Sequence, residues 1–140
     1  MSAKDIYHDQ FVRALQKDGW TITHDPLSIP IEATTLLVDI GAEQMVTADR
    51  DGELIAVEIK SFISLSAVQD LKEAAGQFWL YELALNKSQE HHTRSLFLAV
   101  REEMYQSVFV KGIGKLFMEN HSIRLIVFDP LTEEILQWIK

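Results

Sequence analysis

The sequence contains no cysteine, which excludes disulfide bonds, thiolate metal sites and a cysteine nucleophile. No apolar run is long enough to cross a bilayer, and the N-terminus lacks the pattern of a signal peptide. Internal repeats, linkers and low-complexity segments are also missing from the 140 residues. We therefore expect a single domain over residues 1–140, located in the cytoplasm.

Positive charge is scarce as well. The chain has 13 Lys and Arg residues against 21 Asp and Glu residues, for a formal net charge of −8. Proteins that bind duplex DNA unaided usually present a basic face to the phosphates, so this balance argues against stand-alone DNA binding. Two interpretations remain open: an acidic metal site within an acidic domain, or a domain whose main partner is another protein.

Hydrophobic residues make up 47% of the chain, and their periodicity predicts an α/β domain. The helices are expected at 3–18, from Ser64 or Ser66 to about 86, and at 102–121 with a break near Gly112 and Gly114. The strands are expected at 20–24, 36–40, 45–48, 53–60, 95–100, 123–128 and 135–139. Asp25-Pro26 and Pro30 predict a loop.

The strand at 53–60 is the most informative segment. Asp51-Gly52 precedes it and predicts a tight hairpin turn from the strand at 45–48. Because side chains alternate along a strand, Glu58 and Lys60 share one face with Leu54 and Ala56. Two ionisable groups therefore lie side by side on an otherwise apolar strand.

Two interpretations of Glu58 and Lys60 are possible. In the structural one, the two groups simply compensate each other's charge at a strand end. In the functional one, further carboxylates converge on them: Glu43, just before the first hairpin arm, and Asp39, at the end of the preceding strand. Carboxylates with a lysine can hold Mg²⁺ or Mn²⁺ against a phosphate, with the lysine positioning the attacking water.

The run at 55–61, Ile-Ala-Val-Glu-Ile-Lys-Ser, resembles the E-x-K segment of the PD-(D/E)xK phosphodiesterases. That resemblance implies a restriction-endonuclease-like α-β-β-β-α-β core in three layers with a mixed central sheet, here extended by C-terminal strands. Gln77 and Tyr81, four residues apart on the next helix, resemble the Q-x-x-x-Y pattern that follows the E-x-K strand in several of these nucleases. They are candidates to frame the site, although an ordinary helix face is equally consistent with them.

The first carboxylate of the family pattern has two candidates, since no Pro-Asp pair stands at the expected place. Hairpin geometry favours Glu43, and Asp39 would then assist from nearby or share the metal. Many relatives carry a glutamate on the first helix, where this chain offers Asp5, His8 and Asp9. His8 is either a ligand or base of the site or, as is commoner for a lone histidine on an amphipathic helix, a structural residue.

A more specific resemblance, to the XisH family, covers nearly the whole chain. The matching segments lie at 3–9, 17–20, 22–26, 38–43, 56–62 and 126–130. This resemblance implies a cyanobacterial controlling factor for excision of the fdxN element, a site-specific DNA rearrangement during heterocyst differentiation. It also implies a small protein partner, XisI, and a separate recombinase.

These observations yield two hypotheses for the function. In the first, the chain is a Mg²⁺- or Mn²⁺-dependent DNA endonuclease: Glu43 and Glu58 bind the metal with help from Asp39, and Lys60 orients the water. In the second, it is a catalytically silent nuclease-fold module that regulates by binding XisI, with the acidic stretch at 129–134 and the last strand as an edge for pairing. His91-His92 could bind a metal, but it lies in the polar connection at 86–93, where a solvated loop is expected instead.

Overall fold

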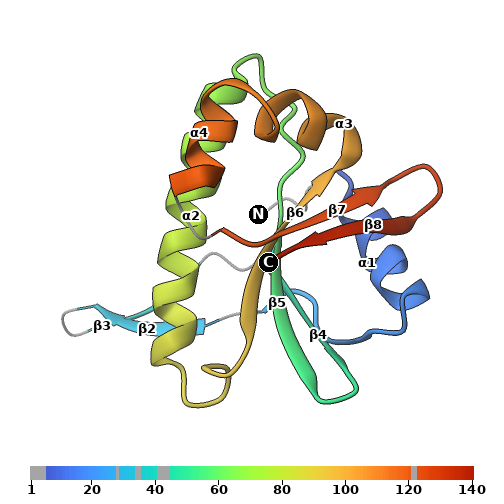
Figure 1. The fold of residues 1–140 in the computed structure, drawn as a ribbon. Helices are drawn as coiled ribbons and strands as arrows, with labels where there is room; N and C mark the ends of the chain where they lie inside the picture. The colour runs from blue at the N-terminus through green and yellow to red at the C-terminus, as the bar shows by residue number, and fades with distance from the viewer. Residues whose placement is uncertain (1–5, 28, 34–35, 41–44, 121–122) are drawn as a thin grey trace.

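The computed structural model describes residues 6–27, 29–33, 36–40, 45–120 and 123–140. A six-stranded mixed sheet lies between helix α1 (His8–Lys17) on one face and helices α2 (Ala67–Lys87) and α4 (Gly112–Asn120) on the other (Figure 1). This arrangement confirms the predicted α/β class with a mixed central sheet. No helix within the described ranges is long and apolar enough to span a membrane.

The remaining elements complete these layers. The strands are β1 (Thr21–His24), β2 (Ile29–Ala33), β3 (Leu36–Ile40), β4 (Met45–Arg50), β5 (Glu53–Ile59), β6 (Ser95–Arg101), β7 (Leu125–Asp129) and β8 (Glu134–Ile139). Between β6 and α4 lie a short helix, α3 (Glu102–Met104), and a π-helical turn, η1 (Tyr105–Phe109). The predicted interruption of the third helical segment is therefore confirmed.

The main sheet has the strand order β1-β4-β5-β6-β7-β8. Its inner neighbours, β5 with β6 and β6 with β7, pair in parallel, whereas β1, β4 and β8 pair antiparallel. Parallel neighbours need a crossover connection, which α2 supplies between β5 and β6 and α4 supplies between β6 and β7. The inner strands are thus covered on both faces, and β5 carries its side chains into the interior.

The β4–β5 hairpin positions the candidate site. Asp51 and Gly52 have φ values of 49° and 85°, the left-handed pair that a two-residue hairpin turn requires. The turn sets the register in which Met45 is the Cα partner of Glu58 on β4. The predicted hairpin and the face on which Glu58 lies are both confirmed.

Helix α2 covers the face of the sheet that carries Glu58. Ser66 caps it, because its side chain accepts a hydrogen bond of 3.1 Å from the backbone N–H of Gln69. The buried stripe consists of Leu71, Ala74, Phe78, Tyr81, Ala84 and Leu85. Leu65 precedes the helix, and the side chains of Leu65 and Val68 are exposed, at 109% and 48%. The apolar stripe therefore starts at Leu71.

Strand β2 was not predicted, whereas β3 occurs at the predicted residues 36–40 but lies outside the main sheet. The two strands form a separate two-stranded antiparallel sheet in which Ile29 pairs with Ile40 and Ala33 pairs with Leu36 (Figure 1). Pro30 suggested a loop, yet a proline is compatible with the outer side of such a pair. The strand at 36–40 is therefore not one of the strands of the main sheet.

Candidate functional site

Glu58 is an ionisable residue within an apolar layer. Its Cα partners are Met45 on β4 and Leu98 on β6, both of which belong to the hydrophobic cluster between the sheet and α2. The Glu58 side chain is completely buried, with 0% of its surface exposed. The alternation of β5 thus directs a carboxylate, rather than an apolar side chain, toward α2.

The carboxylate of Glu58 has no hydrogen-bond partner among the described residues. Both of its oxygens are buried and neither accepts a hydrogen bond there. Burial raises the pKa of Glu58 to about 8, and the positive charge of Lys60 opposes this shift. Without a bound cation, Glu58 is therefore mostly protonated at neutral pH. Isolation of this kind costs several kcal/mol when the group is ionised.

Lys60 follows β5 and reaches α2. Its Nζ lies 3.2 Å from Glu73 Oε2, and 15% of the Lys60 side chain is exposed. Its backbone N–H donates to the carbonyl of Ala99, which extends the pairing with β6 by one residue. Lys60 therefore acts on Glu58 through its charge, while its own ion pair is with Glu73. Glu73 was not a sequence-based candidate, because its contact depends on how α2 packs against the end of β5.

Gln77 and Tyr81 lie on the same side of α2 as Glu73, one and two turns further on. The Oε1 atom of Gln77 is buried without a hydrogen-bond partner among the described residues, and the Tyr81 side chain is only 7% exposed. The expectation that both face the same way is confirmed. Gln77 thus contributes a second buried oxygen acceptor to the layer that contains Glu58.

The structure says less about the other two predicted metal ligands, Glu43 and Asp39. Glu43 lies outside the described residues, and for Asp39 only the backbone position, on β3 in the separate two-stranded sheet, is described. The choice between Glu43 and Asp39 as first metal ligand therefore stays a prediction.

His8 has a partner of its own. It is buried at the start of α1, and its Nε2 lies 2.6 Å from Asp25 Oδ1. Helix α1 packs on the face of the sheet opposite α2, in the cluster formed by residues such as Phe11, Leu15 and Phe128. This contact favours the structural interpretation of His8 over a role beside Glu58.

The site offers oxygen atoms and a cation in a dry environment. Glu58 and Gln77 supply buried oxygens, and Lys60 supplies a positive charge at the partly exposed end of β5. Oxygen ligands of this type suit hard divalent cations such as Mg²⁺ and Mn²⁺. The residues present are therefore compatible with such an ion.

Comparisons with known proteins identify relatives over the full length of the chain. The family model described as XisH protein matches residues 1–136. A crystal structure of an XisH family protein from Nostoc punctiforme is 36% identical with a TM-score of 0.83, covering 97% of this chain and 100% of that one. A crystal structure of an fdxN element excision controlling factor protein from Anabaena variabilis is also 36% identical with a TM-score of 0.84, covering 98% and 100%. No curated protein matches the chain.

Proposed function

The chain belongs to the XisH family, and from this premise we propose that it controls the excision of a DNA element. The Anabaena variabilis relative is described as a controlling factor for excision of the fdxN element. We further propose that this chain contributes a metal-dependent DNA phosphodiesterase activity centred on Glu58. The observation that carries this proposal is the fully buried Glu58 carboxylate without a described partner, next to Lys60.

A bound metal ion would give the buried Glu58 carboxylate the partner that it lacks among the described residues. Glu58 and Glu43 would hold Mg²⁺ or Mn²⁺, with Asp39 assisting, and a bound ion of this kind stabilises charge on a phosphate and lowers the pKa of its water. Glu58 must lose its proton to serve as a ligand, so affinity should increase as the pH rises toward 8. The carbonyl oxygen of Gln77 lies in the same layer and can accept a hydrogen bond from a water in the site.

In the proposed reaction, Lys60, held by Glu73, would position the phosphate group of the DNA. The 3.2 Å contact with Glu73 Oε2 fixes the Lys60 ammonium at the end of β5, where its side chain remains partly exposed. From there Lys60 can balance phosphate charge and orient the attacking water. Tyr81, buried one turn beyond Gln77, frames the site from α2.

The test is cleavage of supercoiled and branched DNA in Mn²⁺, with the chain alone and with an XisI-like partner. We expect nicking by the wild type, and a loss of at least about 100-fold in rate for Glu58→Gln and Lys60→Ala. Glu53→Gln, an exposed glutamate on the same strand, is the matched control and should retain the wild-type rate. Equal rates for Glu58→Gln and wild type would exclude Glu58 from the chemistry.

The second candidate is a catalytically silent regulator that acts by binding an XisI-like protein. Exposed apolar side chains on α2 and α4 favour it, among them Trp79 at 68%, Leu80, Leu83, Ile113 and Leu116. Apolar groups gathered in this way are typical of surfaces that contact other proteins. A stable complex with the partner that Glu58→Gln leaves intact, together with no cleavage by that complex, is the result that would favour this candidate.

A further inference from the structure

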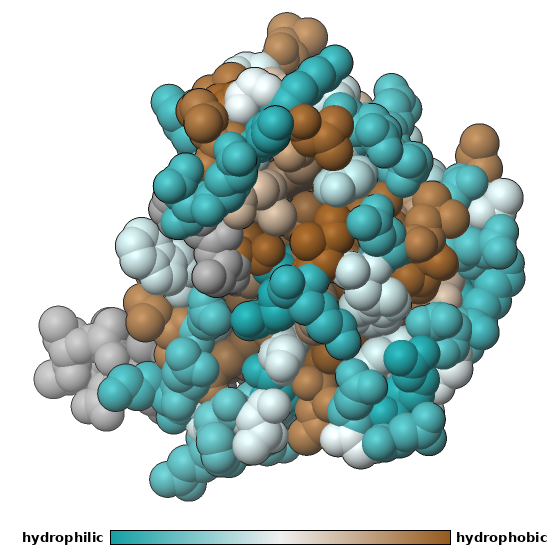
Figure 2. All heavy atoms as spheres, viewed as in Figure 1, coloured by the Kyte–Doolittle hydropathy of each residue, from teal (hydrophilic) through white to brown (hydrophobic). Residues whose placement is uncertain are grey.

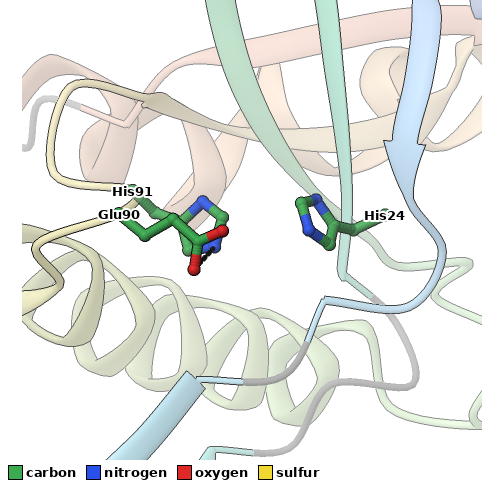
Figure 3. Close-up of side chains that lie close together, drawn as sticks. All are labelled: His24, Glu90 and His91. Carbon is green, nitrogen blue, oxygen red and sulfur yellow. Dashed lines mark ion pairs between the residues drawn. The ribbon is translucent and has the colours of Figure 1, made fainter.

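A second group of ligand-type side chains lies away from Glu58. His24 stands at the end of β1, and Glu90 and His91 stand in the connection between α2 and β6 (Figure 3). One potential ligand atom from each of the three residues lies within 4.8 Å of the other two. The sequence-based expectation of a solvated loop is wrong for His91, which is only 5% exposed. His24 and Glu90 are more accessible, so the group lies at the border of the interior.

A β-bulge holds the His24 ring in place. The pairing of β1 with β4 shifts by one residue between Ile22, opposite Ala48, and His24, opposite Thr47. Both Thr23 and His24 consequently reach the buried Thr47 hydroxyl, with Thr23 Oγ1 at 2.6 Å and His24 Nδ1 at 2.7 Å. With Nδ1 engaged by Thr47, the Nε2 atom of His24 remains for a ligand. Orientation of one ring nitrogen by a neighbouring polar group is typical of histidines that bind metals.

The His91 ring is held by Arg94. Arg94 Nε donates to His91 Nδ1 at 3.2 Å, and Arg94 Nη1 is anchored by Asp49 Oδ1 at 2.8 Å and the Ile55 carbonyl at 3.2 Å. His91 Nε2 faces Glu90 Oε2 at 3.6 Å. Burial, more than any other influence, lowers the pKa of His91.

We propose that His24, Glu90 and His91 form a binding site for a transition-metal cation of the Zn²⁺ class. Two imidazoles and a carboxylate are a ligand set suited to Zn²⁺, unlike the all-oxygen surroundings of Glu58. The two imidazole rings are perpendicular, with their centroids 5.2 Å apart. Three protein ligands leave a fourth tetrahedral position for water or for a group from another molecule.

The approach to tetrahedral geometry requires small movements. Ligands bound to zinc at about 2.0–2.1 Å lie roughly 3.4 Å apart, so the three side chains must close from their present spacing. Glu90 can adapt by rotation because its side chain is 78% exposed. Binding at His91 Nε2 leaves the ring proton on Nδ1, so the Arg94 Nε contact opens while the Arg94 contacts with Asp49 and Ile55 persist.

Zinc bound in this position would join two distant parts of the chain. His24 belongs to an edge strand of the sheet, and His91 follows α2, 67 positions later in the sequence. A ligand that binds the folded state alone stabilises it by mass action, so the melting temperature should rise with the zinc concentration. This inference is independent of the function proposed for Glu58.

The experiment is a calorimetric titration of tag-free protein with Zn²⁺, combined with thermal unfolding. We expect one Zn²⁺ per wild-type chain, affinity reduced at least about tenfold in His24→Ala, and a Zn²⁺-dependent rise in melting temperature that this variant lacks. His24→Ala is preferred to a His91 variant because His24 is the more accessible of the two.

His92→Ala and Glu58→Gln provide the controls. His92 is exposed beside the site and contacts the Ser88 carbonyl, so its removal should change the Zn²⁺ affinity by less than about twofold. Glu58→Gln should retain Zn²⁺ binding. Absence of Zn²⁺ binding, or wild-type affinity in His24→Ala, would overturn the inference, as would loss of Zn²⁺ binding in Glu58→Gln alone.

Discussion

At the scale of single residues, Glu58 occupies a position where an apolar side chain would stabilise the fold more. Its neighbours across the sheet are Met45 and Leu98, and Ala56 precedes it on the same face. An ionised carboxylate without hydrogen bonds in such a layer is destabilising, and groups with strongly shifted pKa values concentrate at functional sites. We propose that a ligand bound by this carboxylate offsets the cost of Glu58 to stability.

The raised pKa of Glu58 predicts how the stability of the metal-free protein depends on pH. Between the ordinary value of 4.5 and about 8, the folded chain holds a proton at Glu58 that the unfolded chain has lost, so the free energy of unfolding should fall as the pH rises. The loss attributable to Glu58 is at most about 5 kcal/mol, at roughly 1.4 kcal/mol per pKa unit. Glu58→Gln cannot ionise and should remove this dependence.

Urea unfolding in EDTA at pH 5, 7 and 9 measures the effect. The stability of Glu58→Gln relative to wild type should increase steadily across this series, while Glu53→Gln, an exposed change on the same strand, should follow wild type. Parallel curves for wild type and Glu58→Gln would mean that Glu58 has an ordinary pKa.

Contacts within one element could be predicted from the sequence, and contacts between elements could not. Strand alternation placed Glu58 and Lys60 on one face, and helical spacing placed Gln77 with Tyr81. The Lys60–Glu73 ion pair was missed because it depends on how α2 packs against β5. The His24–His91 contact was missed because it joins an edge strand to a connection remote in sequence.

At the scale of elements, local turn and cap signals were reliable, whereas the choice of strand partner was not. The Asp51–Gly52 turn and the Ser66 cap each depend on a few consecutive residues and were confirmed. Strand β3 was expected at 36–40 and occurs there, but it pairs with β2 instead of joining the main sheet. Which strands pair depends on competition among all the strands of the chain, and the hydrophobic pattern of a single strand carries no information about that competition.

Gly114 offers an element-scale prediction about the packing of α4 against η1. A Cβ added at Gly114 would lie 1.6 Å from the Val108 carbonyl oxygen, so Gly114→Ala should shift backbone and destabilise the fold by about 2 kcal/mol or more. Gly76, within α2, has nothing within 4 Å of an added Cβ, and Gly76→Ala should stabilise by roughly 0.5–1 kcal/mol. Urea unfolding compares the two changes. Equal effects of the two would contradict the close approach at Gly114.

At the scale of the whole molecule, the acidic charge and the exposed apolar groups point to work in a complex. The net charge of −8 disfavours unaided binding to DNA, so a partner that supplies basic surface would complement the proposed site. Figure 2 shows apolar and polar side chains intermixed on the face of the molecule where α2 and α4 lie. A groove of about 440 Å³ between these helices is lined by Phe78, Trp79, Phe117 and Ile123, among others. Neither Lys60 nor Glu73 is among the residues that line this groove.

The terminal strand retains the edge that we expected to be available for pairing. β8 is the last strand of the sheet, so one of its sides has no neighbouring strand in the described part of the chain. Part of the acidic segment before it is already engaged, because Glu133 Oε2 pairs with Arg13 Nη2 of α1 at 2.6 Å and the Thr132 carbonyl accepts from Lys17. The edge of β8 remains a candidate for partner binding, whereas the turn before β8 already contacts helix α1.

The central claim is that Glu58 is a metal ligand, and a calorimetric titration of metal-free protein with Mn²⁺ at pH 8 tests it most directly. Wild type and Glu53→Gln should bind Mn²⁺ with equal affinity and release about half a proton per ion, because a group with a pKa of about 8 is half protonated at pH 8. Glu58→Gln should bind at least about tenfold more weakly while remaining folded by circular dichroism. Equal Mn²⁺ affinity in Glu58→Gln, or no binding by the wild type, would contradict the claim.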